Sequence, residues 1–244
     1  MQQLAEQMAV DGYAIVPSVL NAGDVQRLSA AVEQARESDH PAAVANSSGV
    51  YGLRNLTEVV PEITSLVESR AIQELLGQLF EHPAFLVRAT LFDKTEGANW
   101  GVFWHQDQSI AVRQRLDVPG FDGWTKKAGV HCVRPPADVM ERIRTIRLHL
   151  DDCGEQQGAL RVLPGTHRMR RLTSDQVEAQ PSGREDVLCR VSAGDAVLMC
   201  PLLLHASSPM TTGTRRRVIH LEFADFDLPD RLEWYHANPY RKSA

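Results

Sequence analysis

The sequence predicts a mainly β protein with flanking helices and a double-stranded β-helix core, the jelly-roll architecture that is also called cupin-like. Three observations support this fold class. Apolar residues recur at helical spacing over much of residues 1–83, short strand-like runs separated by turn clusters follow over residues 84–226, and a His-x-Asp pair is answered by a histidine about a hundred residues later. We therefore expect one domain over residues 1–244, with a helical N-terminal decoration at 1–83 and the jelly-roll core at 84–226.

The N-terminal part is expected to be mostly helical. Its expected elements are residues 2–10, a short strand at Tyr13–Val16, residues 22–37, a helical stretch that starts at Pro61, and residues 70–80. Asn21 is placed to cap the second helix just before Asp24, because its side-chain oxygen can accept a hydrogen bond from a free backbone N–H. Pro61 favours the first turn of the next helix, where a backbone N–H is not needed.

Strand-like runs replace the helical pattern from Phe85 onward. They are expected at residues 85–93, 101–104, 109–113, 144–151, 159–163, 187–191, 196–200, 203–207 and 216–224. Residues 114–142 are rich in glycine, proline and charged residues, and we expect a long loop there. Because loops of this length often close over binding sites, the sequence predicts a lid at 114–142.

The alternation of side chains along three strands predicts a polar cavity. If Arg216 faces the interior of the barrel, every second residue of its strand does so too, whereas Ile219, Leu221 and Phe223 face the other way. The same alternation separates two further polar sets from their apolar neighbours: Thr145, Arg147 and His149 in one strand, and Arg88 and Thr90 in another. These faces are expected to line a cationic pocket, and the alternative is a half-exposed sheet whose polar face meets water.

Composition and charge exclude several classes of partner. The formal net charge is −5 and the pI is about 6.0, so we expect neither a nucleic-acid nor a membrane partner. No apolar run approaches the roughly 20 residues that span a bilayer. The four cysteines show no C-x-x-C spacing and no secretion signal precedes them, which favours reduced thiols and a cytoplasmic protein. The oligomeric state stays open.

A metal site is predicted from three residues. His105 and Asp107 stand two positions apart, and on a strand this spacing places both side chains on one face. His205 would complete a set of two histidines and one carboxylate, the facial triad of non-haem Fe(II) oxygenases. A lone histidine is more often an ordinary surface or core residue, so the prediction depends on the three residues together.

The segment after His205 carries a second signal. A turn rich in Ser, Thr, Pro and Gly reverses the chain, and a basic strand brings Arg216 eleven residues after the histidine. This spacing resembles the phytanoyl-CoA dioxygenase family of iron(II)- and 2-oxoglutarate-dependent oxygenases. The resemblance extends to three further stretches: Gly12–Pro17, Trp104-His105-Gln106-Asp107, and Leu150–His167. Gln157 and Thr166 replace the usual Asn and Ser of the last stretch, and Ile110 stands where the family often has an aromatic residue.

The resemblance implies an Fe(II)- and 2-oxoglutarate-dependent dioxygenase, an oxidoreductase that uses O2, hydroxylates its substrate and releases succinate and CO2. It implies that His105, Asp107 and His205 bind the iron and that Arg216 binds the distal carboxylate of 2-oxoglutarate with its planar fork. Candidates near the cosubstrate are Ser207, Gln106, Trp124 and Thr90, and candidates near the substrate are Arg54, Arg88, His131, Arg147 and His149. No catalytic side chain beyond the metal centre is expected.

Two other classes of function remain open. A Zn(II) hydrolase or a cupin-like metalloenzyme would use the same three ligands with a metal-bound water, and it would not need Arg216. A non-catalytic binding protein would retain the fold alone. For an oxygenase, buried cations such as Arg88, Arg147 and His149 need polar or anionic partners, so a small polar or carboxylate-bearing organic substrate is expected rather than a bare hydrocarbon.

Overall fold

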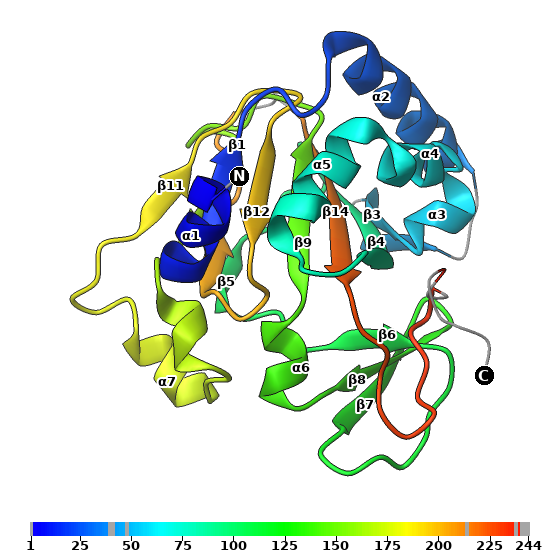
Figure 1. Cartoon of the computed structure of the whole chain (residues 1–244). Coiled ribbons are helices and arrows are strands. Elements are labelled where there is room, and N and C mark those ends of the chain that lie inside the picture. Colours follow the sequence, from blue (N-terminus) through cyan, green and yellow to red (C-terminus); the bar gives the residue numbers. More distant parts are fainter. Residues whose placement is uncertain (1, 39–41, 47–48, 213–214, 237–238, 240–244) are drawn as a thin grey trace.

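The computed structural model describes residues 2–38, 42–46, 49–212, 215–236 and 239 of the chain. Most of its helices lie in the N-terminal third (Figure 1). The helices are α1 (Gln2–Asp11), α2 (Ala22–Glu37), α3 (Leu56–Val59), α4 (Glu62–Glu68), α5 (Arg70–Leu79), α6 (Ala137–Glu141) and α7 (Ser174–Ala179), together with the 3-10 turn Thr166–Met169.

The strands of the described ranges form three antiparallel sheets (Figure 1). A seven-stranded sheet has the order β1 (Tyr13–Val16), β12 (Ala196–Met199), β9 (Arg144–His149), β14 (Arg216–Ala224), β4 (Phe85–Lys94), β3 (Gly49–Arg54) and β2 (Ala43–Asn46). A four-stranded sheet has the order β11 (Val187–Cys189), β10 (Leu160–Val162), β13 (His205–Ser207) and β5 (Val102–His105). A three-stranded sheet has the order β6 (Ile110–Val112), β8 (Val130–Arg134) and β7 (Asp122–Lys127).

The seven-stranded and four-stranded sheets face each other. Val197 and Met199 of β12 pack against Leu160 and Val162 of β10 in one apolar cluster. Farther along the same interior, a cavity lies between β14 and β13. Two facing antiparallel sheets form the predicted jelly-roll core. The nine strands expected from residue 85 onward all form, and each begins and ends within two residues of its predicted bounds.

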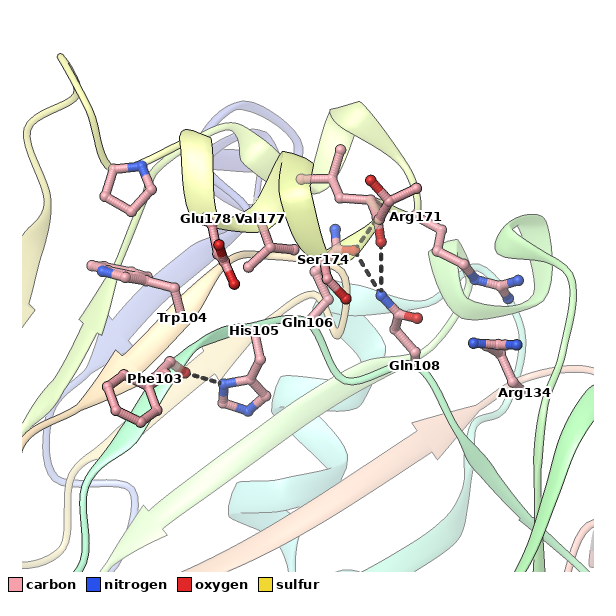
Figure 2. A pocket seen from close by; sticks show the side chains of 13 residues that line it. Phe103, Trp104, His105, Gln106, Gln108, Arg134, Arg171, Ser174, Val177 and Glu178 are labelled. Atoms are coloured by element: carbon pink, nitrogen blue, oxygen red, sulfur yellow. Dashed lines mark hydrogen bonds between the residues drawn. The ribbon is translucent and has the colours of Figure 1, made fainter.

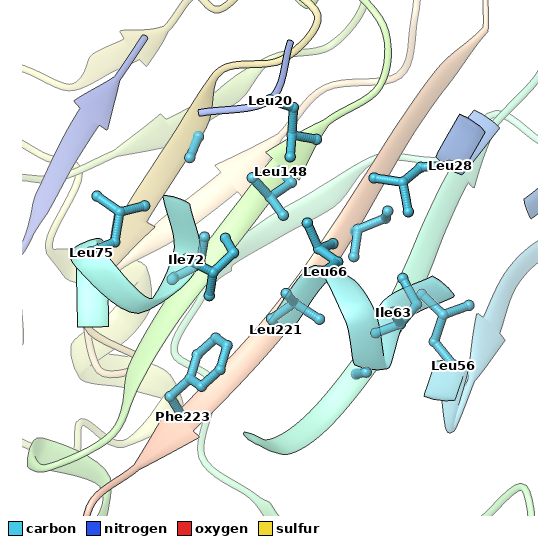
Figure 3. Close-up of a cluster of buried hydrophobic side chains, with 14 of the residues drawn as sticks. Leu20, Leu28, Leu56, Ile63, Leu66, Ile72, Leu75, Leu148, Leu221 and Phe223 are labelled. Carbon is cyan, nitrogen blue, oxygen red and sulfur yellow. The ribbon is translucent and has the colours of Figure 1, made fainter. Parts of the chain in front are cut away.

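Strand β14 lies in the middle of the larger sheet and has two unlike faces. Leu221 and Phe223 point into the main hydrophobic core, beneath the N-terminal helices (Figure 3). Arg216, His220 and Glu222 face the cavity on the other side. The predicted alternation is therefore confirmed for this strand. Burying a side chain of leucine size contributes about 1.5–3 kcal/mol to the stability of the folded state, so packing against the helical layer stabilises this sheet.

Helix α2 of that layer begins at a residue that the sequence predicted as its cap. Asn21 caps α2 as predicted, its side chain accepting a hydrogen bond from the Asp24 N–H at 2.9 Å. Leu28, Val32 and Ala35 then recur at helical spacing and are buried against the sheet. Among the described residues, no helix combines the length and the apolar character that a membrane span requires.

Residues 1–83 contribute strands as well as helices to the fold. Strand β1 forms at Tyr13–Val16 as expected and pairs with β12. The hairpin β2–β3, which was not expected from sequence, joins the larger sheet through β4. Strands β3 and β4 approach each other closely at Gly52. A Cβ at this position would lie 2.7 Å from the carbonyl oxygen of Leu91, so the approach requires glycine. A short strand with internal glycine lacks clear alternation, and the pairing with β4 stabilises it instead.

Residues 114–142 do not form the long loop that was expected. They contain the hairpin β7–β8 and helix α6, and β8 pairs with β6. Val118, Phe121, Val133 and Met140 from this segment are buried in a satellite core with Trp234. These apolar residues follow neither a helical nor a strand period, so the sequence of this segment showed mainly its glycines and prolines. Burial in the satellite core, rather than local propensity, orders the segment.

Candidate active site

Three side chains converge where β5 and β13 pair. His105 ends β5 and lies opposite His205, the first residue of β13. Asp107 lies just beyond β5, with its backbone N–H donating to the Pro201 carbonyl oxygen at 2.9 Å. The Nε2 atoms of His105 and His205 lie 3.9 and 3.7 Å from the Asp107 carboxylate oxygens. One ligand atom from each of the three residues falls within 4.8 Å of the others.

The two imidazoles are oriented by the backbone in the same way. The Nδ1 of His105 lies 2.8 Å from the Phe103 carbonyl oxygen, and the Nδ1 of His205 lies 2.8 Å from that of Leu203 (Figure 2 shows the first of these bonds). A carbonyl oxygen can only accept, so each Nδ1 carries the proton. Each Nε2 therefore presents a free lone pair toward Asp107, the arrangement that metal-binding histidines have.

The electrostatics of the site also suit a metal. Burial, together with the neighbouring His105 ring, lowers the pKa of His205 to about 3, so this imidazole is neutral at neutral pH. Burial alone would raise the pKa of Asp107, but the surrounding imidazoles, that of His205 first, hold it well below its ordinary value. Neutral imidazole and ionised carboxylate are the states that bind a cation, so the residues present fit a metal ion.

A cavity of about 230 Å³ adjoins the triad between the two sheets. It brings together six of the residues selected from sequence in addition to the triad: Arg54, Arg88, Thr90, Arg147, Ser207 and Arg216. Arg88, Thr90 and Arg147 come from strands β4 and β9 of the larger sheet, as the alternation predicted, and Arg54 comes from β3, where no strand was expected. The polar faces of these strands therefore line a pocket and do not meet bulk water.

Arg216 is the middle residue of an arginine triplet and the one that faces this cavity. It is 3% exposed, donates to the Gly158 carbonyl oxygen, and its Nε has no hydrogen-bond partner in the described part of the chain. Arg215 forms a bidentate pair with Asp93 (2.9 and 2.8 Å), and Arg217 forms one with Asp151 (2.9 and 2.6 Å). The two neighbours are thus paired with carboxylates outside the cavity, and of the three arginines Arg216 is the one that lines it.

Lys94 is a residue of this site that the sequence reading missed. It is fully buried and lies opposite Arg216 in the β4–β14 register. Its Nζ donates to the Ser207 Oγ at 3.2 Å and to the Ser208 carbonyl oxygen at 2.7 Å. Burial and the nearby Arg216 guanidinium lower the pKa of Lys94 to about 7. The signal was available, because alternation from Arg88 reaches residue 94 on the same face.

A hydrogen-bonded chain crosses the wall opposite the triad. Arg147 donates to the His220 Nδ1 at 2.9 Å, and the His220 Nε2 lies 3.2 Å from a Glu222 carboxylate oxygen. Arg88 donates to the same carboxylate at 3.1 Å and to the Ser109 carbonyl oxygen at 2.7 Å. Since arginine can only donate, Nδ1 of His220 accepts and its Nε2–H donates to Glu222, which places one proton at a known atom.

Comparison with known proteins agrees with this geometry. The model of the phytanoyl-CoA dioxygenase (PhyH) family matches residues 8–218. The chain belongs to this family. With the family's two-histidine, one-carboxylate set in place, it is an Fe(II)- and 2-oxoglutarate-dependent dioxygenase with a jelly-roll core.

Individual relatives are similar to this chain over most of its length. L-proline trans-4-hydroxylase of Streptomyces griseoviridis is 24% identical over 243 residues, covering 87% of this chain and 82% of that protein. EctD from S. alaskensis, solved with 2-oxoglutarate and 5-hydroxyectoine, superposes with a TM-score of 0.73 at 16% identity over 92% of this chain and 76% of EctD. The epimerase SnoN from nogalamycin biosynthesis, solved with Fe3+ and alpha ketoglutarate, gives 0.70 at 18% identity over 100% and 94%.

Four residues selected from sequence do not line the cavity of this dioxygenase. The Gln106 amide donates to the carbonyl oxygens of Arg170 and Leu202 (2.7 Å each) and accepts from the Leu172 N–H at 2.9 Å, so it anchors loops on the far side of β5. Trp124, on the hairpin β7–β8, stacks with Arg115 at 5.7 Å.

The other two residues outside the cavity are histidines. His131 lies in β8, paired with β6 and β7. His149 is 1% exposed and pairs with Val218, at the end of β9, and neither ring nitrogen has a partner in the described part of the chain. Alternation placed His149 on the same face of β9 as Arg147, but its ring is buried and is not part of the cavity lining.

A larger hollow of about 910 Å³ lies outside the barrel, between β5 and α7 (Figure 2). Phe103, which is 93% exposed, Trp104 and Val177 are among its lining residues. Of the triad, only His105 lines it. All three triad residues line the smaller cavity, and that cavity is the candidate active site.

Proposed function

We propose that His105, Asp107 and His205 hold Fe(II) and that the enzyme hydroxylates a small polar organic substrate while 2-oxoglutarate is converted to succinate and CO2. The observation that carries this proposal is the pair of backbone-oriented imidazoles, whose free Nε2 atoms face one ionised carboxylate. This donor set leaves room in the coordination sphere for a chelating cosubstrate and O2.

Arg216 is proposed to bind the distal carboxylate of 2-oxoglutarate, with help from Lys94 and Ser207. Arg216 lines the cavity, its Nε is buried without a partner in the described chain, and Lys94 adds a second basic side chain in the same register row. A buried planar fork suits a bidentate carboxylate contact. Thr90 lines the wall between this end and the triad and is proposed to contact the cosubstrate along its length.

The chain's own side chains are proposed to position the reactants and to exclude water. When bound, iron, 2-oxoglutarate and O2 supply the oxidation itself. Arg216 orients the cosubstrate from one end of the cavity, and the tip of hairpin β7–β8 borders the cavity through Lys127. The tip is tied down where the Asn55 side chain donates to the Ala128 carbonyl oxygen at 3.3 Å. No side chain has to act as a nucleophile.

The size of the cavity supports a small substrate. Its volume of about 230 Å³ lies below the roughly 300–1,000 Å³ of common ligand pockets, although it must hold the cosubstrate as well. The curated relative is by its name a hydroxylase of L-proline, a molecule of this size class. We therefore propose a substrate of amino-acid size.

Anaerobic addition of Fe(II) and then 2-oxoglutarate tests the function. We expect a visible charge-transfer band in the wild-type enzyme and in His131→Ala, a matched histidine variant outside the cavity. We expect no band in His105→Ala. A wild-type protein that binds metal without the band, and hydrolyses esters without consuming O2, would instead be a zinc-type hydrolase.

A further inference from the structure

The walls of the active-site cavity carry more positive charge than the cosubstrate needs. The lining contains the cations Arg54, Arg88, Arg147 and Arg216, the exposed Lys127 at the rim, and the carboxylates Asp107 and Glu222. Without the exposed lysine, the four arginines exceed the two carboxylates by two charges, and iron(II) and 2-oxoglutarate, which bear opposite double charges, leave this difference unchanged. Because buried cations are rarely left unpaired, a further anion is expected in the cavity.

Two of the arginines already have a partner. Arg88 forms an ion pair with Glu222 at 3.1 Å and donates to a backbone carbonyl. Arg216 is assigned to the cosubstrate, whose distal carboxylate it would share with Lys94. The unmatched charge therefore lies on the remaining cations, of which Arg147 is the most deeply buried.

Arg147 lacks an anionic partner among the described residues. It is 6% exposed, and its one hydrogen bond, at 2.9 Å, goes to an imidazole nitrogen of His220. Its Nε is buried without any partner in the described ranges. Burial, and then Arg216, lower the pKa of Arg147 to about 10, so it still carries its charge at neutral pH. A charged guanidinium with a free buried donor is prepared to bind an anion.

The sheet register separates this position from the cosubstrate end. Arg147 pairs with His220, His220 with Thr90, and Thr90 with Arg54, so these residues form one row across four strands. Arg216 lies four residues farther along β14, which is about 13 Å at the usual rise of a strand. The Arg147 row lies next to the row of Arg88 and Glu222, where Arg88 donates at 2.7 Å to the carbonyl oxygen of Ser109, two residues after Asp107.

We infer that Arg147 forms a second anion subsite, which binds a carboxylate of the substrate beside the metal, with Arg54 as a flanking cation. This inference rests on the proposed function and specifies its substrate class as small carboxylic acids, amino acids included. Arg147 would hold the carboxylate and leave the carbon skeleton directed toward the triad. It is a binding residue, so its loss should affect the substrate and spare the metal and the cosubstrate.

Acetate and acetamide are suitable probes, because they share size and shape and differ in charge. The enzyme is loaded with Mn(II) and 2-oxoglutarate, and the paramagnetic relaxation of the probe's methyl protons is measured by NMR. We expect saturable relaxation of acetate and none of acetamide. Arg147→Gln should weaken acetate binding by on the order of tenfold, since one charge-assisted contact is lost. Arg144→Gln, on the same strand but outside the cavity, should behave as wild type.

The outcomes distinguish a failure of the proposed anion subsite from a failure of the proposed function. Equal relaxation of acetate in wild type and Arg147→Gln, equal relaxation of both probes, or no relaxation of acetate would each overturn the subsite. If the Gln variant does not fold, Arg147→Lys replaces it and is expected to retain acetate with severalfold weaker affinity; unchanged affinity would also overturn the subsite. The charge-transfer band of Fe(II) and 2-oxoglutarate is recorded for each variant, and its absence in wild type would contradict the proposed function itself.

Discussion

The two histidines of the triad are oriented alike but lie in different surroundings. The His105 side chain is 38% exposed and borders both hollows, whereas the His205 side chain is 4% exposed and lies within the barrel. Their replacement should therefore have the same effect on metal binding and different effects on stability.

Alanine at His105, Asp107 or His205 is expected to abolish high-affinity Fe(II) binding and turnover. His205→Ala should in addition lower the free energy of unfolding of the metal-free protein by about 2–5 kcal/mol, the range for large-to-small substitutions in a core, and His105→Ala by much less. Metal titration and urea unfolding measure the two effects. Full iron affinity in any two of the variants would contradict the ligand assignment.

Arg216→Lys is expected to weaken 2-oxoglutarate binding by on the order of 2 kcal/mol while leaving Fe(II) affinity unchanged, because a point charge replaces a planar fork. Arg217→Lys is the matched control, since Arg217 pairs with Asp151 outside the cavity. Isothermal titration of the metal-loaded protein with 2-oxoglutarate measures the difference. A larger loss in Arg215→Lys or Arg217→Lys would show that the cavity arginine is wrongly assigned.

Lys94 makes stability depend on pH. Its pKa falls from the ordinary 10.5 to about 7 in the folded protein. Between these values the unfolded chain binds more protons than the folded chain, so the free energy of unfolding rises with pH over this window. Below about pH 7 the cost of burying the charge is present in full. Above pH 10.5 it is absent.

Lys94→Met is therefore expected to stabilise the metal-free protein relative to wild type most at about pH 6, and progressively less toward about pH 10. The same variant should bind 2-oxoglutarate more weakly. Urea unfolding at both pH values measures the first effect, and the difference between variant and wild type removes contributions from other groups. A difference that does not change with pH would contradict the assigned pKa.

At the scale of elements, the hairpin β7–β8 is held by tertiary contacts with β6 and with Asn55. Lys127 and Val130 pair across a two-residue turn, in which Ala128 and Gly129 have φ of 47° and 81°. Positive φ at both positions is typical of the type I′ turns that connect hairpins. Glycine adopts this conformation readily, but alanine pays roughly 1 kcal/mol for it.

Ala128→Asn is expected to raise the free energy of unfolding by about 1 kcal/mol, because Asn-Gly is the preferred pair for this turn. The backbone oxygen of residue 128 still accepts from Asn55, so activity should not fall. Thermal unfolding checks the stability, with Ala128→Val as the control that should destabilise. Equal melting temperatures for all three proteins would show that the hairpin turn does not have the described conformation.

On the scale of the whole molecule, the net charge of the chain and the net charge of the cavity lining have opposite signs. The chain has a formal net charge of −5, yet cations outnumber carboxylates along the active-site cavity. Buried like charges repel each other, so the metal-free, cosubstrate-free protein carries an electrostatic cost that anions relieve. Ligands that bind only the folded state also stabilise it by mass action.

Removal of metal with a chelator is thus expected to lower the melting temperature. Mn(II) with N-oxalylglycine, a 2-oxoglutarate analogue, should restore it, adding about 2.7 kcal/mol at a hundredfold excess over its dissociation constant. Differential scanning calorimetry measures the change, and Arg216→Lys should gain less. An identical gain from N-oxalylglycine without metal would argue against chelation at the triad.

The sequence by itself determined the local features of this protein. Strand alternation predicted which residues of β9 and β14 face the core, and the structure confirms these faces because alternation is a property of the strand itself, independent of what the strand packs against. The spacing of His105 and Asp107, together with His205, predicted the cluster that the structure brings together. The family resemblance implied Arg216 as the anion-binding arginine, which stays a prediction.

Tertiary structure alone decided the remaining features. Pairing with β4 makes β3 a strand, and burial against Trp234 orders the segment expected to be a lid. Contacts with two loops, through Arg170 and Leu172 of one and Leu202 of the other, turn Gln106 away from the cavity. Only the register between distant strands shows that Lys94 lies beside Arg216 and that Arg147 has no carboxylate partner in the described chain. Such facts depend on residues far apart in sequence, and no local period records them.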